Sequence, residues 1–256
     1  MLGKDIKTTG GAFVIRLPFA DRVEAGRLLA AELATHKLPA NVVVLALPRG
    51  GLPVGLEIAK AFGAPLDVVV VRKLGVPWRP ELAMGAITSG SMQILDEDLI
   101  GALGIPRERI DAVITREKAE VERRENLYRK GRPALDLHGR TVVLVDDGLA
   151  TGSTMLVAAR YVRSLKPGKT LIAVPVGSVE ACQRLKKEAD DCVCLATPET
   201  FAAVGQWYVD FRQVTDTEVR YFLEQGWPFA KLPEEPEPEQ KEEPALATPS
   251  AAVRRP

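Results

Sequence analysis

Two adjacent carboxylates that follow an apolar run are the residues of this sequence best suited to chemistry. Residues 142–145 are all apolar and mostly β-branched, and Asp146 and Asp147 follow them directly. Such a run indicates a strand that is buried on both faces. Ligands of open parallel sheets bind at the carboxyl ends of the strands. We therefore expect both carboxylates to face a binding site rather than the core.

The loop after this acid pair, residues 148–154, carries the groups that a phosphate needs. Its sequence is Gly-Leu-Ala-Thr-Gly-Ser-Thr, so glycines let backbone N–H groups approach an anion and hydroxyl side chains add further hydrogen bonds. A helix is predicted from residue 153, and a helix N-terminus carries roughly half a positive charge. The acid pair and the loop together suit a ligand that has both sugar hydroxyls and a phosphate.

Two other segments place cations or glycines where strands are predicted to end. The apolar run 42–47 stops at residues 48–51, Pro-Arg-Gly-Gly, and the run 66–71 is followed by Arg72 and Lys73. A glycine-rich turn alone is weak support for a site, because most such turns are only turns. Its place at the end of a core strand, as for the acid pair, favours a second anion-binding loop.

The elements that must position these residues alternate between strand and helix. The predicted strands are residues 42–47, 66–71, 141–145, 171–176 and 192–196. The predicted helices are residues 21–36, 96–103, 107–130, 153–165, 179–188 and 216–224. A further helix is predicted after residue 51 and ends at Gly63. Short links between strand, helix and strand require parallel strands with right-handed crossovers. The pattern predicts an α/β fold with a doubly wound, mainly parallel five-stranded sheet.

Residues 1–230 are expected to form one domain with two additions to the sheet. A flexible loop or hairpin is predicted at about residues 75–95, with residues 82–88 and 92–95 as its strands, and long insertions of this kind often act as lids. A small C-terminal hood is predicted at about residues 197–225. The stretch 231–256 is rich in Pro and Glu with few apolar residues, and we predict that it is disordered.

Composition narrows the classes of partner. Lys plus Arg and Asp plus Glu both number 34, and no apolar run reaches the length of a membrane span, so we expect no nucleic-acid partner, no membrane partner and a cytoplasmic location. Cys182, Cys192 and Cys194 lack a CxxC pair or a histidine cluster, and we expect reduced core thiols.

Two other kinds of binding site account for fewer of these motifs. Paired aspartates after an apolar strand also occur in phosphoacceptor receiver domains, but that interpretation leaves residues 48–51 and the hydroxyl-rich loop without a role. A Walker lysine motif and a dinucleotide fingerprint are both absent from the sequence, so binding of a nucleoside triphosphate or NAD is unsupported.

The motifs resemble those of a known enzyme family. Residues 142–154, VVLVDDGLATGST, resemble the signature of the type I phosphoribosyltransferases, which bind phosphoribosyl pyrophosphate, and residues 45–55, LALPRGGLPVG, resemble the pyrophosphate loop of the purine-salvage members. The resemblance covers roughly residues 12–225. With PELAMGAI at 80–87 and AVGQWYVDF at 203–211 it is nearest to a bacterial subgroup whose base substrate is unassigned.

The resemblance implies Mg²⁺-dependent transfer of a 5-phosphoribosyl group to a nitrogenous base, as in nucleotide salvage, with release of pyrophosphate. The acid pair would bind the ribose hydroxyls and stabilise charge in the reaction, and Arg72 or Lys73 would neutralise the leaving group. Mg²⁺ would be held through the pyrophosphate and the acid pair. Family members often have a non-proline cis peptide in the loop at 48–51. The implied donor-binding residues are Arg49, Gly50, Gly51, Asp146, Asp147, Ala150, Thr151, Gly152, Ser153 and Thr154.

The acceptor stays open at this stage. Members that act on 6-oxopurines commonly have Asp where this chain has Ala150, whereas adenine, orotate and uracil enzymes often have Ala. Phe201, Trp207 or Tyr208 could stack on a planar base, although a core role for Trp207 is equally compatible with the sequence. A homodimer is also left open. Two alternatives to base transfer are a regulator that senses the donor without catalysis, and a transferase or hydrolase of an unusual phosphoribosyl compound.

Overall fold

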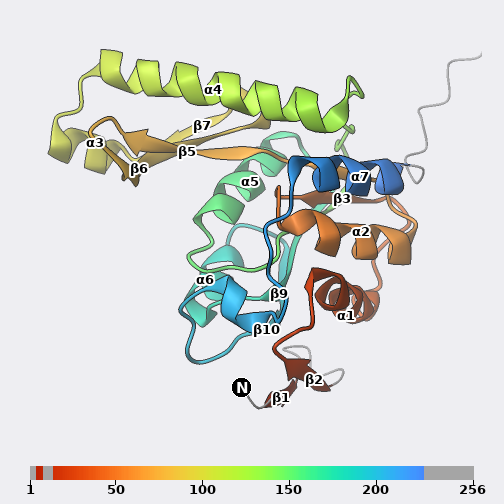
Figure 1. The fold of residues 1–256 in the computed structure, drawn as a ribbon. Helices are drawn as coiled ribbons and strands as arrows, with labels where there is room; N and C mark the ends of the chain where they lie inside the picture. Colours follow the sequence, from red (N-terminus) through yellow and green to blue (C-terminus); the bar gives the residue numbers. More distant parts are fainter. Residues whose placement is uncertain (1–3, 8–13, 228–256) are drawn as a thin grey trace, which may run out of the picture.

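The computed structural model of the chain describes residues 4–7 and 14–227 (Figure 1). The predicted disordered tail, residues 231–256, lies outside the described residues. The described chain begins with an antiparallel pair, β1 (Lys4–Lys7) and β2 (Val14–Leu17). Within these ranges, no helix combines the length and the apolar character that a membrane crossing requires.

A parallel sheet of five strands forms the centre of the fold, as the sequence predicts. Its order is β10-β9-β8-β3-β4, with β3 at Val42–Ala46, β4 at Leu66–Val68, β8 at Thr141–Val145, β9 at Lys169–Val176 and β10 at Asp191–Ala196. Strands β3 and β8 are neighbours, and Ala46 pairs with Val145 at their last residues. Because the strands are parallel, the loops that follow them leave the sheet at the same edge.

Helices cover both faces of this sheet, which confirms the doubly wound architecture. Helices α1 (Arg22–Ala34), α2 (Gly51–Phe62) and α7 (Asp216–Gly226) share one core cluster with Val42, Val44 and Ala46. Helices α5 (Ser153–Ser164) and α6 (Val179–Leu185) share the other with Val43 and Leu45. Successive strand residues point to opposite faces, so the near-continuous apolar runs of the sequence supply both cores.

The predicted insertion forms a separate antiparallel sheet. It contains β5 (Val71–Val76), β6 (Arg79–Thr88) and β7 (Gln93–Leu95), and the expected pairing of residues 82–88 with 92–95 is present in β6 and β7. A 3₁₀ turn, η1 (Ser89–Ser91), joins these two strands. Helices α3 (Glu97–Leu103) and α4 (Arg107–Arg129) follow, and Figure 1 shows α4 running along this sheet. A second 3₁₀ turn, η2 (Val204–Trp207), precedes α7.

The predicted strand 66–71 is wrong in its extent, because the chain changes sheets within it. The Val69 amide donates to the Ala46 carbonyl at the edge of the central sheet, whereas the Val70 carbonyl accepts from Ser89 beside the insertion sheet. All of residues 66–70 are buried, so a continuous apolar pattern spans the crossing. Arg72 and Lys73 therefore lie on β5 of the insertion sheet and do not directly follow a strand of the central sheet.

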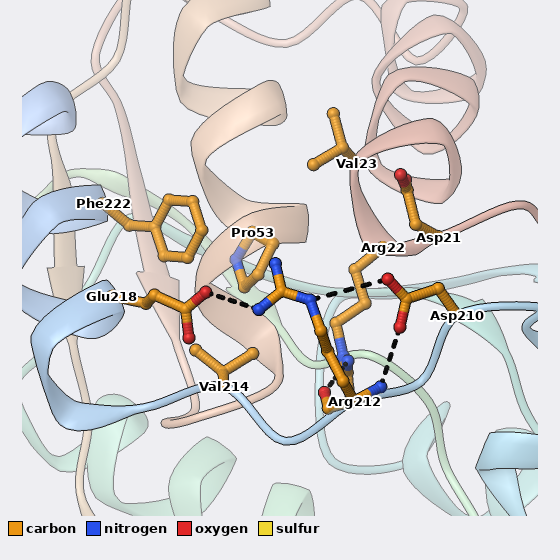
Figure 2. Close-up of a pocket in the computed structure, with 9 residues that line it drawn as sticks. All are labelled: Asp21, Arg22, Val23, Pro53, Asp210, Arg212, Val214, Glu218 and Phe222. Atoms are coloured by element: carbon orange, nitrogen blue, oxygen red, sulfur yellow. Dashed lines mark hydrogen bonds and ion pairs between the residues drawn. The ribbon is translucent and has the colours of Figure 1, made fainter.

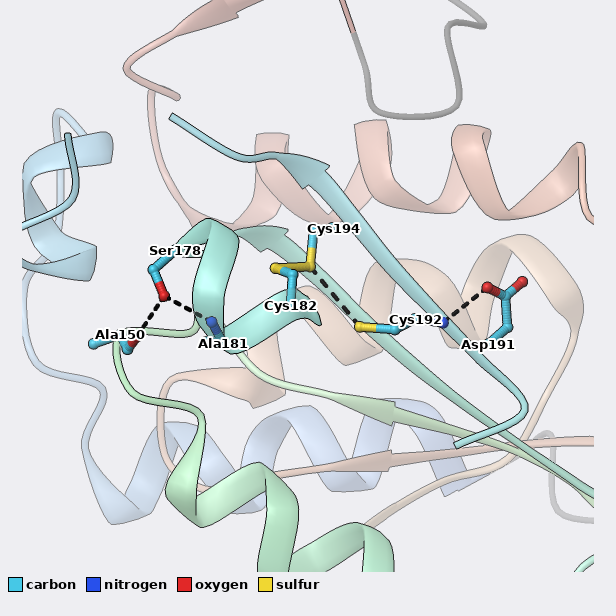
Figure 3. The surroundings of a disulfide bond; sticks show 7 residues. All are labelled: Ala150, Ser178, Ala181, Cys182, Asp191, Cys192 and Cys194. Atoms are coloured by element: carbon cyan, nitrogen blue, oxygen red, sulfur yellow. Dashed lines mark hydrogen bonds between the residues drawn. A yellow bond between two sulfur atoms is a disulfide. The ribbon is translucent and has the colours of Figure 1, made fainter. Parts of the chain in front are cut away.

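The expectation of reduced thiols is also wrong for two of the cysteines. Cys182 of α6 and Cys194 of β10 form a disulfide, and Cys192 is free and buried with its Sγ 3.9 Å from that of Cys194 (Figure 3). Both bonded cysteines belong to the core cluster between α6 and the sheet. Their spacing of 12 residues resembles no disulfide motif, and only the packing of α6 against β10 brings them together.

Reduction of the Cys182–Cys194 bond is expected to lower the free energy of unfolding by about 3 kcal/mol, because a loop of this length loses its closure constraint in the unfolded chain. Urea unfolding with and without dithiothreitol measures the change. Cys182→Ala is the control and should unfold identically under both conditions. Equal midpoints for oxidised and reduced wild-type protein would show that the bond contributes no stability in solution.

Candidate active site

The acid pair and the Pro-Arg-Gly-Gly loop lie against each other at one edge of the central sheet. The Leu47 amide donates to the Val145 carbonyl at 2.8 Å, just before both loops begin. A Cβ added to Gly50 would lie 2.0 Å from Oδ2 of Asp147, and one added to Gly51 would lie 2.7 Å from the Val145 carbonyl oxygen. Only residues without side chains allow this approach, so the two glycines let one loop reach the carboxylates of the other.

Asp147 is held by two residues that come from opposite ends of the chain. Arg22 Nε donates to Asp147 Oδ2 at 2.7 Å, and their side chains are 10% and 14% exposed. The hydroxyl of Tyr208 donates to the Asp147 carbonyl at 2.6 Å. Sequence reasoning missed Arg22, because an arginine at the start of an amphipathic helix gives no sign of its distant partner.

Burial makes the negative charge of the acid pair costly. It raises the pKa of Asp146 well above the ordinary value of 3.8, and the neighbouring charge of Asp147 raises it further. Burial raises the pKa of Asp147 too, against the opposing effect of Arg22. Within the pair, the Asp147 amide donates to Oδ1 of Asp146 at 2.9 Å. Desolvated carboxylates of this kind gain from a ligand that brings hydroxyl donors or a cation.

The predicted phosphate loop ends at the N-terminus of α5. Gly152 caps the helix with a φ of 68°, a left-handed conformation that glycine adopts without strain. Two residues at α6 hold the loop by hydrogen bonds. Ser178 Oγ, at the N-cap of α6, donates to the Ala150 carbonyl at 2.8 Å (Figure 3). The Arg184 guanidinium donates to the Thr151 carbonyl. The Ser153 amide donates to Thr151 Oγ1 at 3.4 Å, and the Thr151 hydroxyl donates to Ser153 Oγ at 3.2 Å. An anion at the start of α5 would replace these weak bonds within the loop.

Arg49 follows β3, the strand next to β8 in the central sheet. The peptide bond between Pro48 and Arg49 is cis, as the family resemblance implies. Nη1 of Arg49 lies 3.7 Å from Oδ1 of Asp216 at the start of α7, and the Tyr128 hydroxyl donates to the same oxygen at 2.8 Å. Helix α7 therefore holds the Arg49 side chain beside the glycine loop.

Arg72 and Lys73 point in different directions. The Arg72 guanidinium donates to the buried carboxylate of Glu117 on α4, at 3.0 and 2.8 Å. Lys73 instead lines a cavity of about 570 Å³ that Ser153 and Thr154 also line. A cavity of this size is in the range of small-molecule sites. Of the two candidate cations, the structure brings only Lys73 towards the phosphate loop.

The aromatic residues proposed for the base differ in exposure. Tyr208 is 5% exposed, with its ring centroid 5.5 Å from that of Phe19 and 5.2 Å from that of Phe211. Phe201 and Trp207 are half-buried, with ring centroids 6.2 Å apart. Nε1 of Trp207 is buried and has no hydrogen-bond partner among the described residues. Tyr208 is thus packed as a support for Asp147, whereas Phe201 and Trp207 keep exposed ring surface.

Comparison with known proteins finds a family model, a curated relative and a solved structure that are similar to this chain. The family model described as "Phosphoribosyl transferase domain" matches residues 21–212. A Mycobacterium tuberculosis protein named "Putative phosphoribosyl transferase Rv0571c" is 47% identical over 208 residues, which are 81% of this chain and 47% of that protein, so the chain spans about half the length of this curated relative. The crystal structure of TT1426 from Thermus thermophilus is 42% identical, with a TM-score of 0.71 over 82% of this chain and 99% of that chain.

Proposed function

This chain belongs to the phosphoribosyltransferase family, and from that premise we propose that it transfers a 5-phosphoribosyl group from phosphoribosyl pyrophosphate to a nitrogenous base. The observation that carries the proposal is the contact of Gly50 with the Asp147 carboxylate. It joins a loop suited to pyrophosphate and an acid pair suited to ribose. The loop after the acid pair leads into the N-terminus of α5, where Ser153 and Thr154 carry hydroxyl groups.

Each part of the donor has a matching group at this edge of the sheet. The ribose 2- and 3-hydroxyls donate to Asp146 and Asp147, in charge-assisted bonds of about 1.5–3 kcal/mol each. The backbone at Gly50 and Gly51 and the guanidinium of Arg49 hold the pyrophosphate. The 5-phosphate is held by residues of the loop before α5 and of its first turn, namely Ala150, Thr151, Gly152, Ser153 and Thr154.

The reaction exchanges one bond at the anomeric carbon for another. The bond from this carbon to the pyrophosphate oxygen breaks, and the electron pair leaves with pyrophosphate. A nitrogen of the base forms the new bond from the opposite face with inversion, and its proton passes to pyrophosphate or solvent. Positive charge develops on the ribose as the leaving group departs, and the ionised acid pair stabilises that charge. Lys73 lines the same cavity as Ser153 and Thr154, and its ammonium donates to the Glu81 carbonyl at 2.9 Å. Arg72 is held by Glu117, so Lys73 is the cation proposed to turn to the leaving group.

The donor set of the site fits Mg²⁺. This ion is usually bound through one or two carboxylates together with substrate phosphates, and the acid pair beside the pyrophosphate loop offers that combination. Groups of three or more His, Cys, Asp or Glu side chains that could hold a metal are absent from the described part of the chain, so the donor would have to complete the coordination. When bound, Mg²⁺ would supply charge neutralisation for the departing pyrophosphate.

The acceptor is proposed to lie between the hood segment and the acid pair. Phe201 and Trp207 are half-buried and offer their rings for stacking, whereas Tyr208 is buried. The insertion sheet would close over the donor and exclude water, which otherwise hydrolyses it. With Ala150 in place of an aspartate, adenine or a pyrimidine suits the loop better than a 6-oxopurine.

Labelled phosphoribosyl pyrophosphate, incubated with Mg²⁺ and a panel of purine and pyrimidine bases, tests this function. We expect a labelled nucleotide and free pyrophosphate with at least one base, and neither product when the base is left out. Tight donor binding without a nucleotide from any base would contradict the transfer reaction. That result would instead favour a donor-sensing regulator or an enzyme for an unusual phosphoribosyl compound.

A further inference from the structure

Arg22 uses three separate surfaces of its guanidinium group, and one of them contacts the acid pair. Nε donates to Asp147 Oδ2 at 2.7 Å. Nη1 donates to the Arg212 carbonyl at 2.9 Å, a bond that Figure 2 shows. The guanidinium carbon lies 3.9 Å from the centroid of the Phe211 ring. The whole residue is 8% exposed. A planar, permanently charged group is suited to bridging several partners in this way.

The stability of α1 does not explain this buried cation. Arg22 is the first residue of the helix, where a positive charge opposes the helix dipole. The N-cap function is met by Asp21, which accepts from the Glu24 amide. Burial of a charge is costly unless the charge is paired and hydrogen-bonded. The partners of Arg22 lie outside α1, in the acid pair and in the hood segment.

The chain around Arg22 is joined to residues 207–212 by backbone hydrogen bonds. The Phe19 amide donates to the Trp207 carbonyl at 2.9 Å, and the Val209 amide donates to the Phe19 carbonyl at 2.8 Å. The Asp210 amide donates to the Ala20 carbonyl at 2.9 Å. Residues 19–20 are therefore joined to residues 207–210 by backbone hydrogen bonds, and the Arg22 side chain reaches from this pair of segments to Asp147.

We propose that Arg22 is a positioning residue, which orients the Asp147 carboxylate for the donor ribose and couples that carboxylate to residues 207–212 of the hood segment. The inference rests on the proposed function. Arg22 holds Oδ2 of Asp147, and Oδ1 is the oxygen that the arginine leaves for a ribose hydroxyl. A donor bound to Asp147 would tighten the Arg22 contacts and thereby order the segment that receives the base.

Calorimetric titration with phosphoribosyl pyrophosphate and Mg²⁺, combined with hydrogen–deuterium exchange of residues 207–212, tests the proposal. Arg22→Gln is expected to raise the donor Kd by about 10- to 100-fold, by analogy with the loss of affinity when a group that orients a metal ligand is removed. In wild type the donor should slow exchange of residues 207–212. In Arg22→Gln that protection should be lost even at a donor concentration that saturates the variant.

Two further variants distinguish the effect of the Arg22 guanidinium geometry from the effects of its charge and of general stability. Arg22→Lys keeps the charge, but an ammonium group lacks the planar fork that bonds Asp147 and Arg212 at the same time. This variant should therefore recover donor affinity without recovering donor-induced protection. Arg27→Gln removes an arginine from the same helix whose side chain is 70% exposed, and it should match wild type in both measurements. If Arg22→Gln fails to fold, the comparison of Arg22→Lys with Arg27→Gln tests the coupling alone.

The outcomes distinguish this inference from the function on which it rests. If wild-type protein binds no donor, that result would contradict both the proposed function and the inference. Wild-type protein that binds the donor, with Arg22 variants equal to it in affinity and in protection, would overturn only the inference. Variants that lose affinity but keep donor-induced protection would overturn the coupling to the hood segment.

Discussion

Asp146→Asn is expected to weaken binding of phosphoribosyl pyrophosphate by about 10- to 150-fold, the equivalent of one charge-assisted hydrogen bond of about 1.5–3 kcal/mol, without loss of stability. The amide keeps the shape of the side chain but accepts less strongly from a ribose hydroxyl. It also removes a charge that the fold disfavours, because burial and the neighbouring Asp147 raise the pKa of Asp146 well above 3.8. We therefore expect an unfolding free energy at neutral pH equal to or above that of wild type.

Stability and pH should be linked through the same residue. A carboxyl group with a raised pKa in the folded state binds its proton more tightly there than in the unfolded chain. Its contribution to stability is therefore greatest at low pH, and it declines as pH rises from about 3.8 through the raised pKa. Urea unfolding across this pH range should show a decline in wild type that is smaller in Asp146→Asn.

Asp147→Asn should lose donor affinity with little net change in stability. The variant leaves the Arg22 charge buried without a charged partner, but it also removes a carboxylate charge whose burial raises the pKa of Asp147. Asp111→Asn, on the exposed face of α4, is the control and should change neither quantity. Normal donor binding by the Asp146→Asn and Asp147→Asn variants would show that the donor binds elsewhere.

The parts of the fold that were predictable are those that a short stretch of sequence determines. The apolar runs 42–47 and 141–145 are buried at nearly every position, so both were recognisable as core strands without knowledge of their neighbours. Their adjacency as β3 and β8 is a finding of the structure, because neither run indicates which strand lies beside it. Arg22 and the Cys182–Cys194 bond were missed because each depends on packing between distant segments.

The choice between Arg72 and Lys73 shows a second limit. Both residues are cations after the same apolar run, so composition and spacing treat them alike. Neighbouring residues of a strand point to opposite faces, and once β5 packs against α4, Arg72 meets Glu117 while Lys73 faces the cavity. The sequence could place both cations near the site, but only the orientation of β5 separates their roles.

Gly50→Ala is expected to reduce kcat/KM for the donor by about 100-fold, since displacement of a catalytic group by about 1 Å can cost that much. Gly50 has an ordinary helical φ of −63°, so alanine strains no backbone angle at this position. The new Cβ would instead lie 2.0 Å from Oδ2 of Asp147, the oxygen that Arg22 holds. The carboxylate must move, and it then loses its bond to Arg22 and its alignment with the ribose.

A second glycine provides a matched control for this substitution. Gly101 in α3 has open space around the position of an added Cβ, so Gly101→Ala should keep wild-type kinetics. Steady-state kinetics and donor titration measure both variants, and circular dichroism checks that each is folded. Wild-type donor affinity in a folded Gly50→Ala protein would mean that the loop and Asp147 do not bind the donor together. A loss confined to Gly50→Ala would instead show that donor binding depends on a glycine at this contact between the two strand ends.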